Sequence, residues 1–70
     1  MQATEPSLVH ESADSEAWRA GGFTFFAEGA GVIVTKDTPR GILSVNVYTY
    51  KTNEQACDAA YKMARRQMRA

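Results

Sequence analysis

The chain is poor in the residues that build cross-linked or metal-held structure. It has 70 residues with one cysteine and one histidine, so its own side chains can form neither an internal disulfide nor a structural zinc site. Its longest apolar run, Ala30 to Val34, contains a glycine and is far shorter than a membrane span. The N-terminus also lacks the order of a signal peptide. We therefore expect a cytoplasmic protein without membrane association.

The chain also has no excess of charge of either sign. Eight acidic residues balance eight basic ones, which disfavours a general nucleic-acid binder, because such affinity comes mostly from neutralising phosphates. The charges are unevenly placed. Residues 1–20 hold four acids and one base, whereas residues 51–70 hold two acids and five bases. The two ends can attract each other, or either can bind a charged partner.

The composition, with 44% hydrophobic and 23% charged residues, predicts one small globular domain. We place this domain at residues 12–70. Residues 1–11 have no apolar periodicity, so we expect them to form a flexible N-terminal arm. A short N-terminal helix is one interpretation of residues 15–20, and Gly21-Gly22 would end it.

Three segments typical of β-strands follow, joined by short turns that contain glycine or proline. The segments are rich in aromatic and β-branched residues and comprise Phe23–Ala27, Val32–Lys36 and Gly41–Tyr50. Because both connections are short, we expect a three-stranded antiparallel meander. In the third segment the alternation separates an apolar side, made of Leu43, Val45 and Val47, from a side that carries Ile42, Asn46, Tyr48 and Tyr50.

A C-terminal helix is predicted from Thr52 onward. Thr52 and Gln55 match a capping box, and neither glycine nor proline follows up to Ala70. One face of this helix is apolar and mostly small, so we expect it to pack across the apolar side of the third strand. The predicted class is α+β: a three-stranded antiparallel meander with a C-terminal helix on one face and the short N-terminal helix as an option.

Side chains suited to catalysis are scarce. His10 lies in the predicted arm, away from any fixed partner that a general base would need. Cys57 lies on the apolar face of the predicted helix, where a cysteine usually behaves as a small hydrophobic residue. The glycines at Gly29 and Gly31 lack the Gly-Lys-Ser/Thr signature of a phosphate loop. We therefore expect no enzymatic activity, no metal site and no cofactor.

Two surfaces are candidates for binding a partner. The first is the polar side of the third strand, with Asn46, Tyr48 and Tyr50, a mixture that is typical of protein interfaces. The alternative is that Trp18 and its segment cover this side. The second surface is the basic stripe of the helix, made of Lys62, Arg65, Arg66 and Arg69. This stripe is either a solvated helix end or a contact for acidic protein or phosphate.

We expect a non-enzymatic binding module that recognises or blocks a protein or nucleoprotein partner. Tiny neutral chains of this kind resemble phage-encoded inhibitors of host machinery, including anti-CRISPR proteins, and the resemblance implies action by occluding a partner's surface. A nucleic-acid-binding module that uses the basic helical face is the alternative. The strand edges also leave open pairing with a second copy, as a homodimer, or with a partner's strand.

Overall fold

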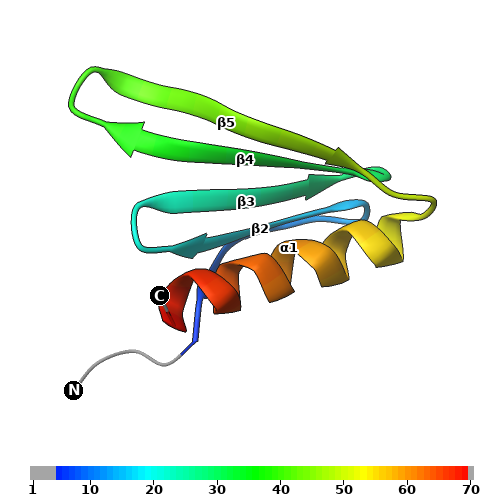
Figure 1. Ribbon diagram of the computed structural model, residues 1–70. Helices are drawn as coiled ribbons and strands as arrows, with labels where there is room; N and C mark the ends of the chain where they lie inside the picture. The colour runs from blue at the N-terminus through cyan, green and yellow to red at the C-terminus, as the bar shows by residue number, and fades with distance from the viewer. Residues whose placement is uncertain (1–4, 70) are drawn as a thin grey trace.

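The computed structural model describes residues 5–69, and of Arg69 the backbone alone. It contains β1 (Ser7–Glu11), β2 (Ser15–Ala20), β3 (Phe23–Glu28), β4 (Gly31–Thr38), β5 (Gly41–Thr49) and α1 (Asn53–Arg69). The strands form one antiparallel sheet in chain order, and α1 lies on one of its faces (Figure 1). The α+β class is therefore confirmed, but the sheet has five strands where three were expected. Within residues 5–69, no helix has the length and apolar character needed to cross a membrane.

The N-terminal part of the chain forms two strands, so the expected N-terminal helix is wrong. Gly21 and Gly22 both have positive φ, 57° and 83°, as the two central residues of a type I′ hairpin turn require. This turn pairs Ala20 with Phe23 and aligns the whole of β2 with β3. The glycines thus form the turn of the β2–β3 hairpin instead of ending a helix. Pairing with β3 overrides the helical preference of the residues in β2.

The segment expected as an arm, residues 1–11, contains β1 from Ser7 onward. All five residues of β1 are exposed, and a bulge at Val9 interrupts their pairing with β2. Residues 1–4 lie outside the described part of the chain. The structure therefore adds an edge strand at a place where the apolar pattern of the sequence is too short to predict one.

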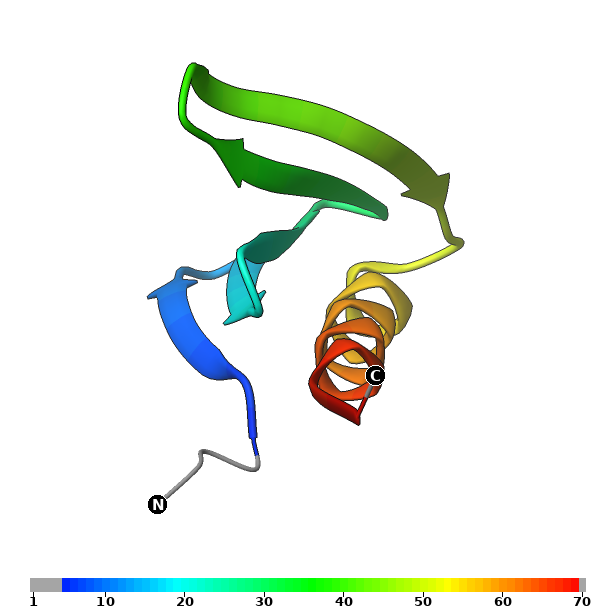
Figure 2. The ribbon, with the colours of Figure 1, turned by 60° about the vertical axis from the view of Figure 1, so that its left-hand side comes forward.

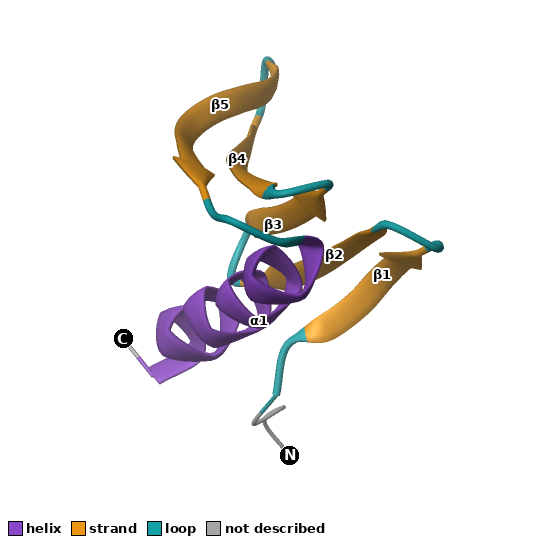
Figure 3. Cartoon of the chain, turned by 90° about the vertical axis from the view of Figure 1, so that its right-hand side faces the viewer, coloured by secondary structure: helices purple, strands orange, loops and turns teal. Residues whose placement is uncertain are grey.

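The strands curve partway around α1, leaving β1 and β5 as the two edges of the sheet (Figures 2 and 3). The helix packs mainly on β3 and β2, and less on β4. Its buried face consists of Ala56, Ala60 and Ala64, each 0% exposed, and such small side chains let the helix lie close to the sheet. Phe25 and Val32 are the larger members of the core that this face covers.

Strand β5 lies beyond the area that α1 covers, and all nine of its residues are exposed. Leu43, Val45 and Val47 are 58%, 51% and 61% exposed. The expectation that these three residues form the floor beneath the helix is therefore wrong. The helix instead occupies the surface over β2 and β3, two strands that were not expected to pair with each other.

The register between β4 and β5 explains why the side of β5 that faces the helix is the opposite of the predicted one. Val32 and Val34 are buried under the helix and pair with Tyr48 and Asn46. Because directly opposed residues lie on the same face of a sheet, Tyr48 and Asn46 are on the helix side. A bulge in this pairing also breaks the strict alternation on which the prediction depended.

The start of α1 is fixed by side-chain hydrogen bonds. The Thr52 hydroxyl accepts the Gln55 N–H at 3.1 Å, which confirms Thr52 as the capping residue. The Gln55 side chain accepts the Lys51 N–H at 3.1 Å, one residue earlier than in a standard capping box. The Asn53 Nδ2 donates to the carbonyl oxygens of Asp14 at 2.8 Å and Gly29 at 2.6 Å. Asn53 thereby ties the helix to the β1–β2 and β3–β4 turns.

Candidate functional site

A groove runs between α1 and β5 on the helix side of the sheet. It consists of two hollows of about 340 and 290 Å³ that share Tyr48, Met63 and Arg66. Each hollow is near the lower limit of the volumes typical of ligand pockets. The first is also lined by Phe25, Val34, Val45, Asn46 and Gln67, and the second by Tyr50, Ala59 and Lys62. We call this feature the α1–β5 groove.

The sheet wall of the α1–β5 groove is organised by Asn46. Its Nδ2 donates to the Tyr48 hydroxyl at 2.9 Å, and its Oδ1 accepts the backbone N–H of Val47 at 2.9 Å. These two bonds hold the amide against the strand and fix the position of the Tyr48 hydroxyl. Tyr50 is half-buried, and its backbone N–H donates to the carbonyl of Ala30 at 2.7 Å. The groove thus has a wall of positioned polar and aromatic side chains.

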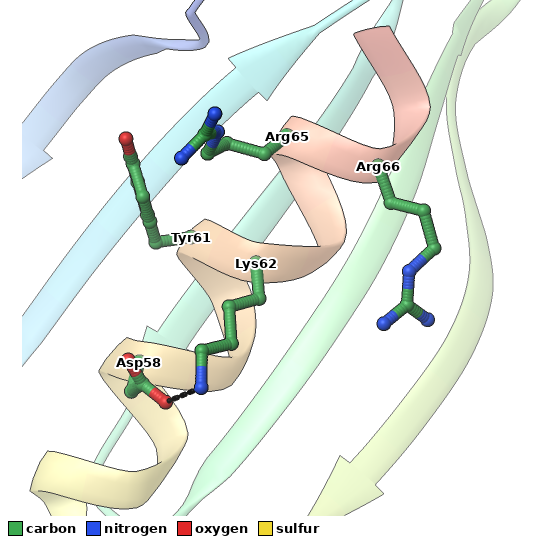
Figure 4. Close-up of a pocket in the computed structure, with 5 residues that line it drawn as sticks. All are labelled: Asp58, Tyr61, Lys62, Arg65 and Arg66. Atoms are coloured by element: carbon green, nitrogen blue, oxygen red, sulfur yellow. Dashed lines mark ion pairs between the residues drawn. The ribbon is translucent and has the colours of Figure 1, made fainter. Parts of the chain in front are cut away.

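The helix wall of the groove is basic. The Lys62 ammonium forms an ion pair with Asp58 at 2.9 Å, and both side chains remain well exposed. Arg66 extends toward the β5 side of the helix (Figure 4). Among residues 5–69, no ion pair involves Arg66, and the described lining of the two hollows contains no acidic residue. Arg66 is therefore the unneutralised cation of this groove.

Arg65 follows a different course from its neighbour. The two arginines diverge to opposite flanks of α1 (Figure 4), and the Arg65 guanidinium lies 5.9 Å from the centre of the Tyr61 ring. Tyr61 in turn packs edge-on against Trp18, with 4.8 Å between ring centres. A further hollow over the outer surface of the helix is lined by Asp58, Tyr61, Lys62, Arg65 and Arg66 (Figure 4). Three residues of the predicted basic stripe, Lys62, Arg65 and Arg66, thus share this outer hollow, whereas only Lys62 and Arg66 also line the α1–β5 groove. The Arg69 side chain lies outside the described atoms.

The structure brings together residues that the sequence assigns to two separate surfaces. Asn46, Tyr48 and Tyr50 share the α1–β5 groove with Lys62 and Arg66. Trp18 does not cover the tyrosines, because it packs on the far flank of α1 and donates its indole N–H to Glu16 at 3.1 Å. Val45, Met63 and Gln67 also line the groove and were not predicted as site residues. Neither the period-2 alternation of a strand nor the spacing of helical residues identifies them, because the register of β5 decides which residues face the groove.

The face of the sheet opposite the helix carries a second apolar feature. The pairing registers align Ala17, Phe26, Ile33 and Val47 across β2 to β5, and we call these four residues the outer row. At the β2 end, His10 stacks on Phe26 with 5.7 Å between ring centres, and Ala17 is only 3% exposed. Toward β5 the exposure rises to 38% at Ile33 and 61% at Val47. The outer row is thus covered at one end and open at the other.

Two groups with catalytic potential have local roles in the structure. The His10 Nε2 lies 3.0 Å from the Ser15 hydroxyl, which lies 2.5 Å from that of Ser12. Because Ser15 is buried at 5% exposure, these contacts fasten the β1–β2 turn. Burial, together with the nearby charge of Glu16, raises the pKa of the Cys57 thiol, which disfavours the nucleophilic thiolate. Within residues 5–69, no three His, Cys, Asp or Glu side chains gather closely enough to hold a metal ion.

Compared with protein-family models, with curated proteins and with solved structures, the chain matches none.

Proposed function

We propose that the protein is a non-enzymatic binding module that holds an acidic segment of a protein partner in the α1–β5 groove and so blocks that segment. The observation that carries this proposal is the convergence of Tyr48 and Asn46 from the sheet with Arg66 from the helix in one groove. Tyrosine and arginine are the residue types most enriched at the energetic centres of protein interfaces.

The charge of the groove favours an anionic partner. Arg66 contributes a positive charge that has no ion-pair partner among residues 5–69, and the described lining residues of the two hollows include no carboxylate. Asp58, the ion-pair partner of Lys62, lines only the hollow over the outer surface of the helix. A carboxylate that enters the groove can therefore form charge-assisted hydrogen bonds with the Arg66 guanidinium, in the two-pronged geometry that arginine provides.

The apolar part of the groove favours a protein segment over nucleic acid. Phe25, Val34, Val45 and Met63 line the first hollow beside Arg66, and methionine adapts readily to the shapes of different apolar side chains. A nucleic-acid site depends mainly on clustered cations, whereas this chain has zero net charge. The partner segment we propose therefore combines acidic residues with at least one large apolar residue.

Fluorescence anisotropy with a labelled peptide of alternating glutamate and leucine or phenylalanine tests this function. The variants Tyr48→Ala and Arg66→Glu should each weaken binding about tenfold or more, because each removes a contact at the centre of the groove; tenfold corresponds to about 1.4 kcal/mol. Arg65→Glu is the matched control. It makes the same charge change one residue away, on the other flank of α1, and should change the affinity by less than about threefold.

Three outcomes would contradict the proposal. Equal weakening by Arg65→Glu and Arg66→Glu would mean that long-range charge, and not the groove, drives binding. Absence of peptide binding to the unaltered protein would remove the proposed ligand class. Binding of a labelled single-stranded oligonucleotide in preference to the peptide, with a steep loss as salt increases, would instead support the nucleic-acid alternative. Circular dichroism of each variant confirms that the fold is retained.

A further inference from the structure

Most of the branched aliphatic side chains of this protein face solvent. Of the nine Ile, Leu and Val residues in the sequence, Val32 and Val34 are buried and the other seven are at least 38% exposed, namely Leu8, Val9, Ile33, Ile42, Leu43, Val45 and Val47. Four of the seven belong to β5. A domain of this size has little apolar burial to spare, and clustered exposed apolar residues mark interaction surfaces. Strand β5 is therefore the part of the fold where the most aliphatic side chains lack a covering neighbour.

The two edges of the sheet differ in how they are protected from pairing. Strand β1 is five residues long, contains His10 and Glu11, and has a bulge at Val9. Short length, charge and bulges are the usual means of blocking an edge strand. Strand β5 is nine residues long, and its sequence GILSVNVYT contains no charged residue. Its bulge falls at Val45, because Asn46 pairs with Val34 and Ser44 with the adjacent Thr35, so residues 46–49 form the regular part of this edge. Strand β5 is therefore an edge suited to pairing.

The backbone groups available at this edge follow from the pairing with β4. The Tyr50 N–H donates to the carbonyl of Ala30. In an antiparallel ladder, alternate residues point toward the same neighbour, so Val47 and Thr49 direct their N–H and C=O groups toward the free edge. The Val47 N–H is occupied by the Oδ1 of Asn46 at 2.9 Å. This side-chain oxygen stands where the carbonyl of another strand would bind.

We propose that β5 pairs antiparallel with β5 of a second copy of this chain, about a two-fold axis at Val47. Val47 then lies opposite Val47 of the second copy, and each N–H donates to the other's carbonyl. Thr49 lies opposite Val45 of the second copy, where the bulge of β5 interrupts the ladder, so Val47 forms the central regular hydrogen-bonded pair. Asn46 releases the Val47 N–H and lies beside Tyr48 of the second copy. The outward-pointing N–H and C=O groups of Val47 thus gain backbone partners in this register.

Two observations favour a second copy over an unrelated strand. The outer row ends at Val47, its most exposed member. The two-fold axis places the outer row of the second copy directly beyond Val47, so that apolar side chains of the two copies meet. The charge pattern is also compatible with self-pairing. Because β5 is uncharged and Lys51 lies beyond its end, no like charges are opposed in this register; opposed like charges destabilise strand pairs.

This dimer is a separate proposal from the function, because the α1–β5 groove lies on the helix side of β5 and the pairing uses its edge. Asn46 is the residue that both use, since its Oδ1 leaves the Val47 N–H on pairing. The two-fold axis is perpendicular to the joined sheet, so both α1 helices lie on the same side of it. The two grooves then open beside each other, separated by the two β5 strands. A dimer thus presents two basic grooves on one surface without covering either.

The test is the molar mass in solution, measured by sedimentation velocity over a range of protein concentrations. We expect the unaltered protein to have twice the mass of one chain. Val47→Lys and Val47→Glu should each weaken the dimer about tenfold or more, because each opposes like charges at the two-fold axis. An equal mixture of the two variants should restore the dimer, because lysine then opposes glutamate. This restoration also shows that both variants fold.

Val9→Lys on β1 is the matched control, since Val9 is also an exposed edge valine, at 52%, and this variant should remain dimeric. A single-chain mass for the unaltered protein at all concentrations would overturn the proposal. Equal dissociation by Val9→Lys and Val47→Lys, or a failure of the mixture to form dimers, would overturn it as well.

Discussion

Cys57 shows how a side chain's surroundings set its chemistry. It packs against the core cluster, and its thiol points to the Oδ1 of Asn53 at 3.8 Å. Burial is the larger cause that raises its pKa, and the charge of Glu16 is the smaller one. Both disfavour the thiolate. The position of Cys57 in the first turns of α1, which taken alone would favour a negative charge, is therefore outweighed.

The rate at which iodoacetamide alkylates Cys57 should reveal this shift. Because only the thiolate reacts, the midpoint of the rate against pH should lie above that of the unfolded chain in urea. Glu16→Gln should move the midpoint down, since it removes the smaller of the two causes. The free energy of unfolding should be insensitive to this group below the unfolded thiol pKa of about 8.5 and should fall as the pH rises above it. A midpoint equal to that of the unfolded chain would contradict the assignment.

At the scale of single residues, the sequence indicates which side chains are suited to binding but not which of them meet. Asn46, Tyr48 and Arg66 were predicted from residue type and exposure, and they do line the α1–β5 groove. Arg65 was predicted with the same weight and lies over Tyr61 on the other flank. The difference is a rotation of about 100° between consecutive helical residues. Because of the direction in which α1 crosses the sheet, this rotation places Arg66 in the α1–β5 groove and Arg65 over Tyr61.

At the scale of secondary-structure elements, Asn53 connects three parts of the fold. Its two N–H donors bind the carbonyls of Asp14 and Gly29, which belong to different turns. Without these bonds, the Gly29 carbonyl loses the Asn53 donor, and the Asp14 carbonyl keeps the Gly29 N–H at 3.1 Å. A single side-chain amide thus reinforces the docking of α1, which also rests on the packing of its alanine face on the sheet.

The variants Asn53→Ala and Asn53→Asp should both destabilise the fold by about 1–2 kcal/mol, because both remove the donors. Asn53→Asp is the sharper variant. It keeps the size of the side chain and places a negative charge at the helix N-terminus, which by itself would be stabilising. The measurement is urea unfolding at one fixed protein concentration, so that any association contributes equally. An Asn53→Asp protein as stable as the unaltered one would show that the two bonds are unimportant.

Local signals in the sequence were sufficient for some elements and not for others. The C-terminal helix, its Thr52 cap and the hairpin from β3 to β4 were predicted because caps, turns and strand composition act over a few residues. Strand β2 was missed because its alanine, glutamate and arginine favour a helix, and only pairing with β3 makes it a strand. The side of β5 that faces the helix depends on a register and a bulge, which no alternation pattern contains.

At the scale of the whole molecule, the helix protects one part of the sheet and leaves another unprotected. Strand β3 is hydrogen-bonded on both sides and lies under α1. Strand β5 is bonded to β4 alone, and all nine of its residues are exposed. Local opening should therefore be easiest at β5 and most difficult at β3.

Amide hydrogen exchange should follow this gradient across the sheet. In the Val47→Lys variant, which we expect to be monomeric, the amides of Phe25 and Ala27 should exchange most slowly and that of Thr49 most rapidly. Tyr48, whose amide bonds to β4, should be intermediate. If the unaltered protein pairs through β5, protection should increase at Val47 specifically. Protection in β5 equal to that in β3 in the monomeric variant would contradict the gradient.

The bulge at Val9 determines how far the proposed assembly can extend. A five-strand sheet has two ends, and if both accepted another copy, chains would add without limit into a filament. The two-fold contact at Val47 uses β5 of both copies, which leaves β1 at each outer end. Because β1 is short and its pairing pattern is interrupted at Val9, it is a poor template for a further strand. Growth therefore stops at two copies, and the assembly is a closed pair and not an open fibre.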